Sequence, residues 1–311
     1  MALQVEEYLS HRRSLGFKLR AEGELLASFA RYVNQKGHRG PLTTSLAVEW
    51  AQKGRTPTMQ RARRLQCVHR FAQYRALFDP KTEIPPKDLL GVYRPPRRFY
   101  IYTDREIRDL LIAASQARYR SLLVPVVYPT LFGLLACTGL RVSEALGLTD
   151  EDVDLQQGVL RVRYGKFGKS RYLPVAPSTL RALHQYEDVR DRRLGRRHGH
   201  VFLLGDDGRP LTYRRVLGKF HRLRWKLGWL GNDRTRWPRI HDLRHTFAVR
   251  RLLRWYQEGS NVDEKILLLS TYLGHVNVTK TYWYLTAVPE LLAIVGARFH
   301  EFAKNQMEGV S

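Results

Sequence analysis

Six side chains between positions 141 and 284 are of the types that handle a phosphate group. They are two arginines, a lysine, two histidines and a tyrosine: Arg141, Lys166, His241, Arg244, His275 and Tyr284. Arginine, lysine and histidine can bind or protonate phosphate oxygens, and a tyrosine hydroxyl can act as a nucleophile. Such a set suits an enzyme that cleaves and rejoins DNA through its own tyrosine.

The first motif is Thr-Gly-Leu-Arg-Val-Ser-Glu-Ala-Leu, at positions 138–146. Arg141 is expected to open a helix, where its guanidinium can grip two phosphate oxygens together. Glu144 follows one turn later and can orient that guanidinium. Taken alone, such a pair is more often a surface salt bridge.

The second motif is Ile-His-Asp-Leu-Arg-His-Thr-Phe-Ala, at positions 240–248. His241 and Arg244 lie one helical turn apart, so both can reach the same phosphate. His241 and His245 also have the four-residue spacing of a zinc site. Asp242 replaces the glutamate that such sites use as a base, and Arg244 would repel a cation. We therefore expect no metal and no cofactor.

The third motif runs from Tyr272 to Tyr284 and contains Leu-Gly-His. Gly274 is expected to end one helix and Thr279 to cap the next, which carries two tyrosines. Tyr282 and Tyr284 lie about 200° apart on a helix, so only one of them can face a phosphate. Spacing from His275 favours Tyr284. Alone, the segment would also suit a tyrosine in a buried core.

The remaining pattern predicts a mainly α protein with a small β-sheet. Residues 1–84 read as an all-helical N-terminal domain, 85–100 as a linker rich in proline and arginine, and 101–311 as a mixed α+β domain with a C-terminal helix. Between positions 153 and 175 apolar and polar residues alternate, and β-branched residues are frequent. This predicts a β-hairpin whose tip holds both Lys166 and Lys169.

Charge indicates the type of partner. The chain has 53 Lys and Arg against 29 Asp and Glu, a formal net charge of +24, of which +11 falls in residues 1–100. A surplus of this size, spread over both halves, points to a polyanion bound by both domains. A helix is expected from about Pro57 to Phe78, and two arginines share one of its faces. Candidate DNA-binding residues are these two arginines, those of the linker and the basic residues of the hairpin: Arg63, Arg70, Arg97, Arg98, Lys169 and Arg171.

Other features favour a cytoplasmic, nucleoid-associated protein. Charged residues interrupt any early apolar run, which argues against a signal peptide. The longest apolar stretch contains Pro125 and Pro129 and is too short to span a bilayer, so no membrane association is expected. Cys67 and Cys137, the two cysteines, both lie in apolar helical segments, where a structural disulfide is not expected.

At the three motifs the sequence resembles the tyrosine recombinase (phage integrase) family. The family has an arginine in T-G-x-R-x-x-E-x-x-x-L, a lysine at a hairpin tip, H-x-x-R on a later helix, then L-G-H with a tyrosine nine residues after that histidine. All occur here in order, over about residues 101–290. The N-terminal helices also resemble the core-binding domain of the family.

The resemblance implies a role for each residue. Arg141 and Arg244 would clamp the scissile phosphate, and His241 and His275 would hydrogen-bond it and assist proton transfer. Lys166, or alternatively Lys169, would protonate the 5′-oxygen, and Tyr284 would attack phosphorus. The product would be a 3′-phosphotyrosyl link, and neither ATP nor metal would be needed.

The resemblance also implies partners. The family acts as a homotetramer on two DNA duplexes, through a Holliday junction, at specific sites of inverted-repeat type. A role in a mobile element is expected, and other recombinases or DNA-bending proteins are further candidate partners. A helix at 288–295 would dock on a neighbouring subunit or on its own domain. A type IB topoisomerase and a catalytically silent DNA-binding protein with this fold are the alternatives.

Overall fold

The computed structural model describes residues 1–92, 99–116, 122–163, 170–195, 201–231, 237–275 and 277–287, and for residues 286 and 287 it describes the backbone alone. Lys166, Lys169, Arg97, Arg98 and the C-terminal helix expected at 288–295 lie outside the described residues. The chain divides into two compact units, residues 1–97 and 98–311, here called the N-terminal and C-terminal units.

The described part of the N-terminal unit has four helices: α1 (Ala2–Ser14), α2 (Arg20–Gln35), α3 (Thr44–Gln52) and α4 (Thr58–Arg75). The hydroxyl of Thr43 caps α3 by accepting from the backbone N–H of Leu46. Apolar side chains from all four helices share one core, with Phe29 and Phe71 fully buried. The segment after α4 packs on this unit, because His69 Nδ1 lies 2.8 Å from the Pro85 carbonyl oxygen.

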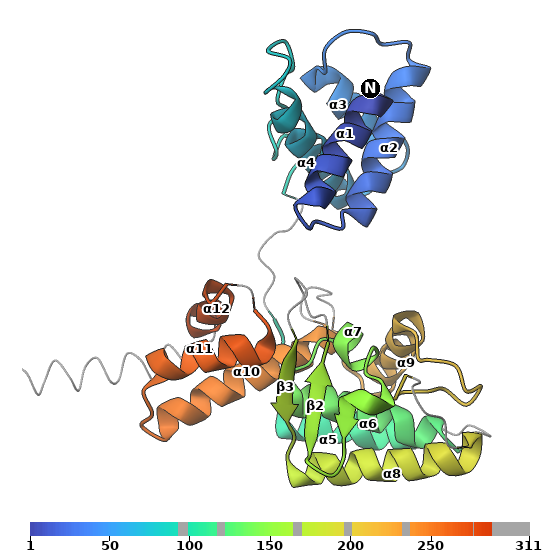
Figure 1. Ribbon diagram of the computed structural model, residues 1–311, viewed down its shortest axis with the longest axis vertical. Coiled ribbons are helices and arrows are strands. Elements are labelled where there is room, and N and C mark those ends of the chain that lie inside the picture. The colour runs from blue at the N-terminus through green and yellow to red at the C-terminus, as the bar shows by residue number, and fades with distance from the viewer. Residues whose placement is uncertain are drawn as a thin grey trace, which may run out of the picture. The chain divides into compact units, whose positions relative to one another are not determined.

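The C-terminal unit contains eight further helices in its described part and a small sheet (Figure 1). The helices are α5 (Asp104–Ser115), α6 (Val124–Thr138), α7 (Val142–Ala145), α8 (Pro177–Leu194), α9 (Tyr213–Lys226), α10 (Ile240–Gln257), α11 (Val262–Leu273) and α12 (Thr279–Ala287). Strands β1 (Val153–Asp154), β2 (Val159–Val162) and β3 (Arg171–Pro174) pair antiparallel in the order β1-β2-β3. The expectation of a mainly α fold with a small sheet is confirmed.

Local chemistry sets the ends of the helices that matter for the site. Thr103 begins α5 with a capping box, in which its side chain accepts from Glu106 N and Glu106 accepts from Thr103 N. Gly139 and Gly274 end α6 and α11 in the left-handed conformation, at φ 62° and φ 66°. These two turns bring the ends of α6 and α11 together with the start of α10.

Helix α6 is the centre of the C-terminal unit. It packs against α5, α8 and α10, and its buried residues Leu131, Phe132 and Leu135 are at most 1% exposed. Helices α10, α11 and α12 form a second hydrophobic cluster, which includes Tyr284. Figure 1 shows these three helices grouped on one side of the unit, and strand β3 contacts α11. No described helix is both long enough and apolar enough to cross a bilayer.

Candidate active site

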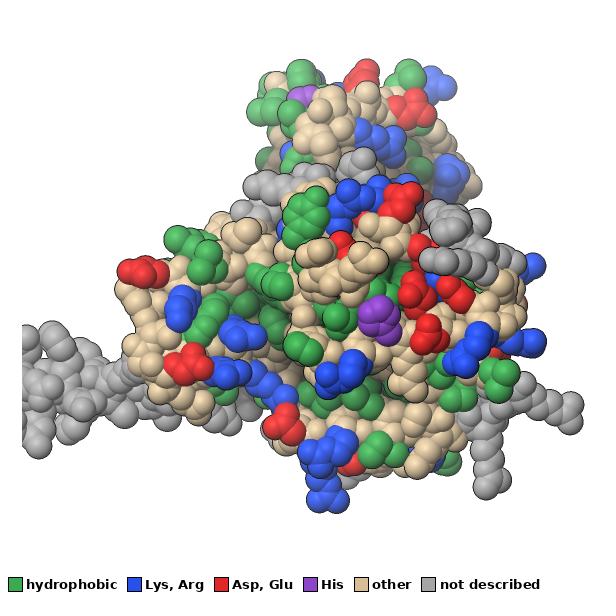
Figure 2. All heavy atoms as spheres, turned by 60° about the horizontal axis from the view of Figure 1, so that its bottom comes forward, with side chains coloured by type: hydrophobic (Ala, Val, Ile, Leu, Met, Phe, Trp, Pro, Cys, Tyr) green, Lys and Arg blue, Asp and Glu red, His purple; other side chains and the backbone are tan. Residues whose placement is uncertain are grey.

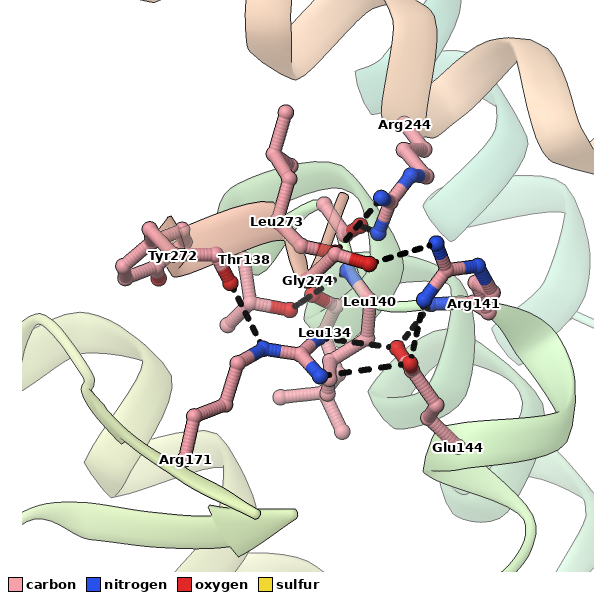
Figure 3. Close-up of polar contacts among 11 residues, drawn as sticks. Leu134, Thr138, Leu140, Arg141, Glu144, Arg171, Arg244, Tyr272, Leu273 and Gly274 are labelled. Carbon is pink, nitrogen blue, oxygen red and sulfur yellow. Dashed lines mark hydrogen bonds and ion pairs between the residues drawn. The ribbon is translucent and has the colours of Figure 1, made fainter. Parts of the chain in front are cut away.

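The first feature of the site is the position of the two arginines predicted to bind phosphate. Arg141 stands just before α7, and Arg244 lies on the second turn of α10. Arg244 donates from Nη1 to Gly139 O (2.7 Å) and from Nη2 to Leu273 O (2.6 Å). Arg141 donates from Nη2 to Gly274 O at 3.0 Å. The two guanidinium groups therefore approach the same turn from α7 and α10 (Figure 3).

Glu144 holds Arg141 in this orientation. Its carboxylate accepts from the backbone N–H of Arg141 (2.9 Å) and from Arg141 Nη1 (2.6 Å). It also accepts from Arg171 Nη1 (3.3 Å) and Nη2 (3.0 Å). Burial raises the pKa of Glu144, but hydrogen bonds from Arg171 and Arg141 outweigh it, so the net pKa is lowered. The carboxylate is therefore ionised at neutral pH and bridges two cations.

Arg171 makes its described contacts within the protein. It was expected among the DNA-contacting residues, but its side chain is only 11% exposed, and its Nε donates to Tyr272 O at 2.7 Å. Glycine is favoured at position 274 beside it, because φ is 66° there and a Cβ would also lie 2.8 Å from Arg171 Nη1. The guanidinium of Arg171 thus joins strand β3 to the end of α11 and to Glu144, and it is engaged inside the protein.

Burial and mutual repulsion set the charges of the site. Arg244 is 2% exposed, and desolvation together with the charge of Arg141 lowers its pKa to about 10, so it stays protonated at neutral pH. His275 has its pKa lowered to about 3 by desolvation and then by Arg244 and Arg141. The pKa of the exposed His241 is also lowered, by desolvation and by the same two arginines. The two histidines are therefore neutral beside two cations.

Asp242 has a structural task. It is fully buried and accepts from Arg239 N at 2.9 Å and from Arg239 Nη2 at 2.8 Å, which anchors the start of α10. Within the described ranges, no three His, Cys, Asp or Glu side chains gather in a geometry for a metal ion.

The two candidate tyrosines have different surroundings. Tyr282 is 40% exposed, whereas Tyr284 is 2% exposed and its ring lies 6.5 Å from that of His275. Burial raises the pKa of Tyr284 to about 12, although Arg244 and Arg141 act to lower it. Tyr284 is therefore the tyrosine that faces the arginines and histidines, and its phenol is protonated at neutral pH.

Two contacts in the site did not follow from the sequence. Thr281, fully buried, places Oγ1 2.8 Å from His275 Nδ1 and so orients that ring. His245 places Nδ1 2.9 Å from the phenolic oxygen of Tyr284. Helical spacing could have put Thr281 and Tyr284 on one face of α12, because they are three residues apart. Nothing in the sequence indicates which partners that face would meet.

The other DNA-binding candidates in the described part lie on α4. Arg63 and Arg70 line one small cavity with Glu22, and Arg70 Nη2 lies 3.6 Å from Glu22 Oε1. On the face drawn in Figure 2, Lys and Arg side chains are interspersed with Asp and Glu and with hydrophobic side chains. The basic surplus is not gathered into one patch on that face.

Comparison with known proteins gives one consistent result. Residues 102–290 match the Phage integrase family. A protein of Sinorhizobium fredii (strain NBRC 101917 / NGR234) named as an integrase/recombinase, y4rB, is 42% identical over 93% of each chain. The tyrosine recombinase XerD of Vibrio vulnificus (strain YJ016) is 28% identical over 77% of this chain and 73% of its own.

Solved structures share the fold. The Tn1549 transposon integrase in complex with transposon right end DNA matches with a TM-score of 0.68 at 20% identity, over 97% of this chain and 99% of that one. A lambda integrase dimer bound to a core site matches with a TM-score of 0.62 at 17% identity, over 91% of this chain and 94% of that one. At these identities the likeness establishes the architecture alone.

Proposed function

The chain belongs to the phage integrase family, and from that premise we propose that it is a site-specific DNA recombinase acting through a 3′-phosphotyrosyl intermediate. The observation that supports this most is the convergence of Arg141, Arg244 and His275 near the buried phenol of Tyr284. These groups come from four separate segments of the chain. Their meeting at one turn is what transfer of a phosphodiester to a tyrosine requires.

Arg141 and Arg244 are proposed to bind the scissile phosphate. Guanidinium carries five N–H groups, and the hydrogen bonds within the described part of the chain occupy two on each arginine. The remaining N–H groups can take the non-bridging oxygens. Because backbone carbonyls already hold both groups, little reorganisation is needed when negative charge develops on the phosphate.

Proton transfer is assigned to the histidines and a lysine. His241 and His275 have lowered pKa values, so each is neutral at pH 7 and can both donate and accept a hydrogen bond. Lys166 is proposed to protonate the 5′-oxygen that leaves, with Lys169 as the alternative donor. Both lysines belong to the hairpin tip, outside the described residues.

Tyr284 is proposed as the nucleophile. Its oxygen would form a bond to phosphorus and give its proton to a neutral histidine of the site, while the bond from phosphorus to the 5′-oxygen breaks and that oxygen takes a proton from the lysine, leaving a 5′-hydroxyl. The phosphodiester energy is kept in the tyrosyl link, so that rejoining needs neither ATP nor metal. Because the pKa of the phenol is raised to about 12, the hydroxyl is protonated at neutral pH and its proton must leave as the bond to phosphorus forms.

The proposal extends to partners and setting. We propose double-stranded DNA with inverted-repeat sites as the substrate. A homotetramer would bind two duplexes, and recombination would proceed through a Holliday junction. The net charge of +24 supports DNA binding by both units. The names of relatives support a mobile-element role, since one is an integrase/recombinase and a structural neighbour is a transposon integrase. The protein would act in the cytoplasm on the nucleoid, with other recombinases or DNA-bending proteins as candidate partners.

Trapping the covalent complex tests the proposal. The full chain is incubated with fragmented genomic DNA, protein-bound fragments are recovered under denaturing conditions, and both the DNA and the modified peptide are sequenced. Wild type and Tyr282→Phe should give adducts on the peptide that contains Tyr284, and Tyr284→Phe should bind DNA without an adduct. An adduct that survives in Tyr284→Phe and disappears in Tyr282→Phe would overturn the assignment.

Independence from metal is tested on the same fragments. Cleavage in excess EDTA should match cleavage without it, because the proposed electrophilic groups are side chains. Loss of the adduct in EDTA, with recovery on adding one divalent metal, would contradict the proposed mechanism. Native mass spectrometry of the trapped complex should give four chains with two duplexes, and a stable complex of one chain with one duplex would argue against the tetramer.

A further inference from the structure

The phenol of Tyr284 has a specific partner that the proposed mechanism does not use. His245 Nδ1 lies 2.9 Å from the phenolic oxygen. His245 follows Arg244 directly on α10, and Tyr284 lies on α12, so this contact links the two helices. It is a direct hydrogen bond to the atom that would attack phosphorus.

Aromatic rings fix the imidazole of His245 in place. The ring of Phe99 stacks on it with centroids 5.1 Å apart and planes 28° apart. The ring of His241 meets it edge-on at 4.8 Å and 89°. Phe99 also contacts Tyr284 edge-on at 5.8 Å. The imidazole therefore has little freedom to turn away from the phenol.

The charge state of the pair is defined by its surroundings. Desolvation, followed by His241 and Arg239, lowers the pKa of His245 to about 3. Arg244 and His275 act in the same direction. Because the pKa of Tyr284 is raised to about 12, both rings are neutral at pH 7. A neutral imidazole nitrogen can then accept the phenolic proton in a hydrogen bond.

We propose that His245 is the positioning residue of the nucleophile: by accepting the hydrogen bond of Tyr284, it fixes where the phenolic oxygen points. The inference rests on the proposed function, because it takes Tyr284 to be the attacking group. A displacement of about 1 Å at a reacting atom can cost roughly 10²-fold in rate. Loss of the hydrogen bond at position 245 should therefore slow cleavage without weakening DNA binding.

Three substitutions at one position test the idea. In His245→Asn an amide atom stands close to the place of Nδ1, whereas in His245→Gln the amide reaches the place of Nε2, and His245→Ala has neither. The substrate is the duplex identified by genomic trapping, with a nick beside the cleaved bond so that the adduct accumulates. His184→Ala, an exposed histidine on α8, is the matched control.

We expect adduct formation by His245→Ala to be about 10²-fold slower than by wild type, with the dissociation constant for DNA unchanged. His245→Asn should recover to within about tenfold of wild type. His245→Gln should stay as slow as His245→Ala, and His184→Ala should match wild type. A purely structural role would not separate Asn from Gln, so equal rates for those two variants would overturn the proposal. If His245→Ala does not fold, the comparison of Asn with Gln decides the matter.

A second measurement examines the contact without cleavage. With 3-fluorotyrosine at position 284 of the full chain, the ¹⁹F resonance in DNA-free protein should move in His245→Ala and His245→Gln, and less in His245→Asn. An unmoved resonance in His245→Ala would refute the contact. If wild type forms its adduct on Tyr284 but the position 245 variants all cleave normally, only this inference fails. If Tyr284→Phe still forms the adduct, the proposed function fails first.

Discussion

Replacing Glu144 with glutamine should destabilise the C-terminal unit and slow cleavage. The carboxylate accepts four hydrogen bonds, two from Arg141 and two from Arg171, and it is 8% exposed. Glutamine keeps the shape but turns one acceptor oxygen into an NH₂ group. That group would face guanidinium or backbone donors, and the buried positive charge would lose its counterion.

The size of the effect follows from burial. Breaking a buried ion pair by removing one partner costs about 3–5 kcal/mol. The lower end applies here, because Arg141 is 24% exposed and Arg171 keeps its bond to Tyr272 O. We therefore expect a loss of about 3 kcal/mol, which corresponds to a fall of roughly 1 M or more in the urea midpoint.

Urea unfolding of the full chain, followed by fluorescence and circular dichroism, measures the transition of the C-terminal unit. Glu258→Gln is the matched control, because its pair with Arg254 is 48% and 68% exposed and should be worth less than about 0.5 kcal/mol. Adding Arg171→Met to Glu144→Gln should restore about 1–3 kcal/mol, because the unpaired cation is removed. A Glu144→Gln protein that unfolds and cleaves like the Glu258→Gln control would refute the bridging role.

Acid should destabilise the C-terminal unit. The pKa of His275 is about 3 in the folded protein and 6.5 in the unfolded chain, so folding favours the neutral ring. The stability that this preference contributes is complete above pH 6.5 and is lost as the pH falls from 6.5 towards 3. Between about pH 6 and pH 4.5 the free energy of unfolding should fall by roughly 1 kcal/mol per pH unit because of this histidine, and it should fall less steeply in His275→Gln. Urea unfolding measured from about pH 7 to about pH 4.5 would contradict this if the two proteins showed the same dependence on pH. Gly139→Ala should cost about 2 kcal/mol or more in the same assay, because φ is 62° and the new Cβ would lie 2.6 Å from Phe247 Cδ1. Gly218→Ala, where a Cβ meets nothing within 4 Å, should stabilise by about 0.5–1 kcal/mol, and equal effects at the two glycines would exclude this reasoning. Arg244→Lys should slow adduct formation by roughly 10²-fold or more, because a point charge cannot bond Gly139 O, Leu273 O and a phosphate together, and rapid cleavage by it would count against the clamp.

Features encoded locally could be predicted from the sequence. The caps at Thr43 and Thr103 and the stop at Gly274 depend on side chains or backbone freedom within a few residues, and the structure has helix ends at each. The fold class and the family followed from such signals together with the order of the motifs. Helical geometry also required that only one of Tyr282 and Tyr284 face inward. Tyr282 is 40% exposed and Tyr284 is 2% exposed, so Tyr284 is the one that faces inward.

Contacts between distant segments could not be predicted. Arg171 follows a basic hairpin tip and so looks like a surface residue, yet its guanidinium bonds a carbonyl 101 positions away. His245 was weighed only as a partner of His241, because periodicity reveals which residues share a helix face but not which helix packs against it. Its bond to Tyr284 depends on the packing of α12 on α10, which a single sequence does not contain.

Apart from the Glu144 carboxylate, the acceptors that hold the side chains of Arg141 and Arg244 are the main-chain carbonyls of Gly139, Leu273 and Gly274. No amino-acid replacement removes a carbonyl, so missense changes at these positions can disturb the anchorage only by bending the backbone. A single-codon insertion or deletion in either turn would instead carry the carbonyls out of reach. In a random mutant library, the turns after α6 and α11 should therefore reject length changes more strictly than the longer connection between α8 and α9.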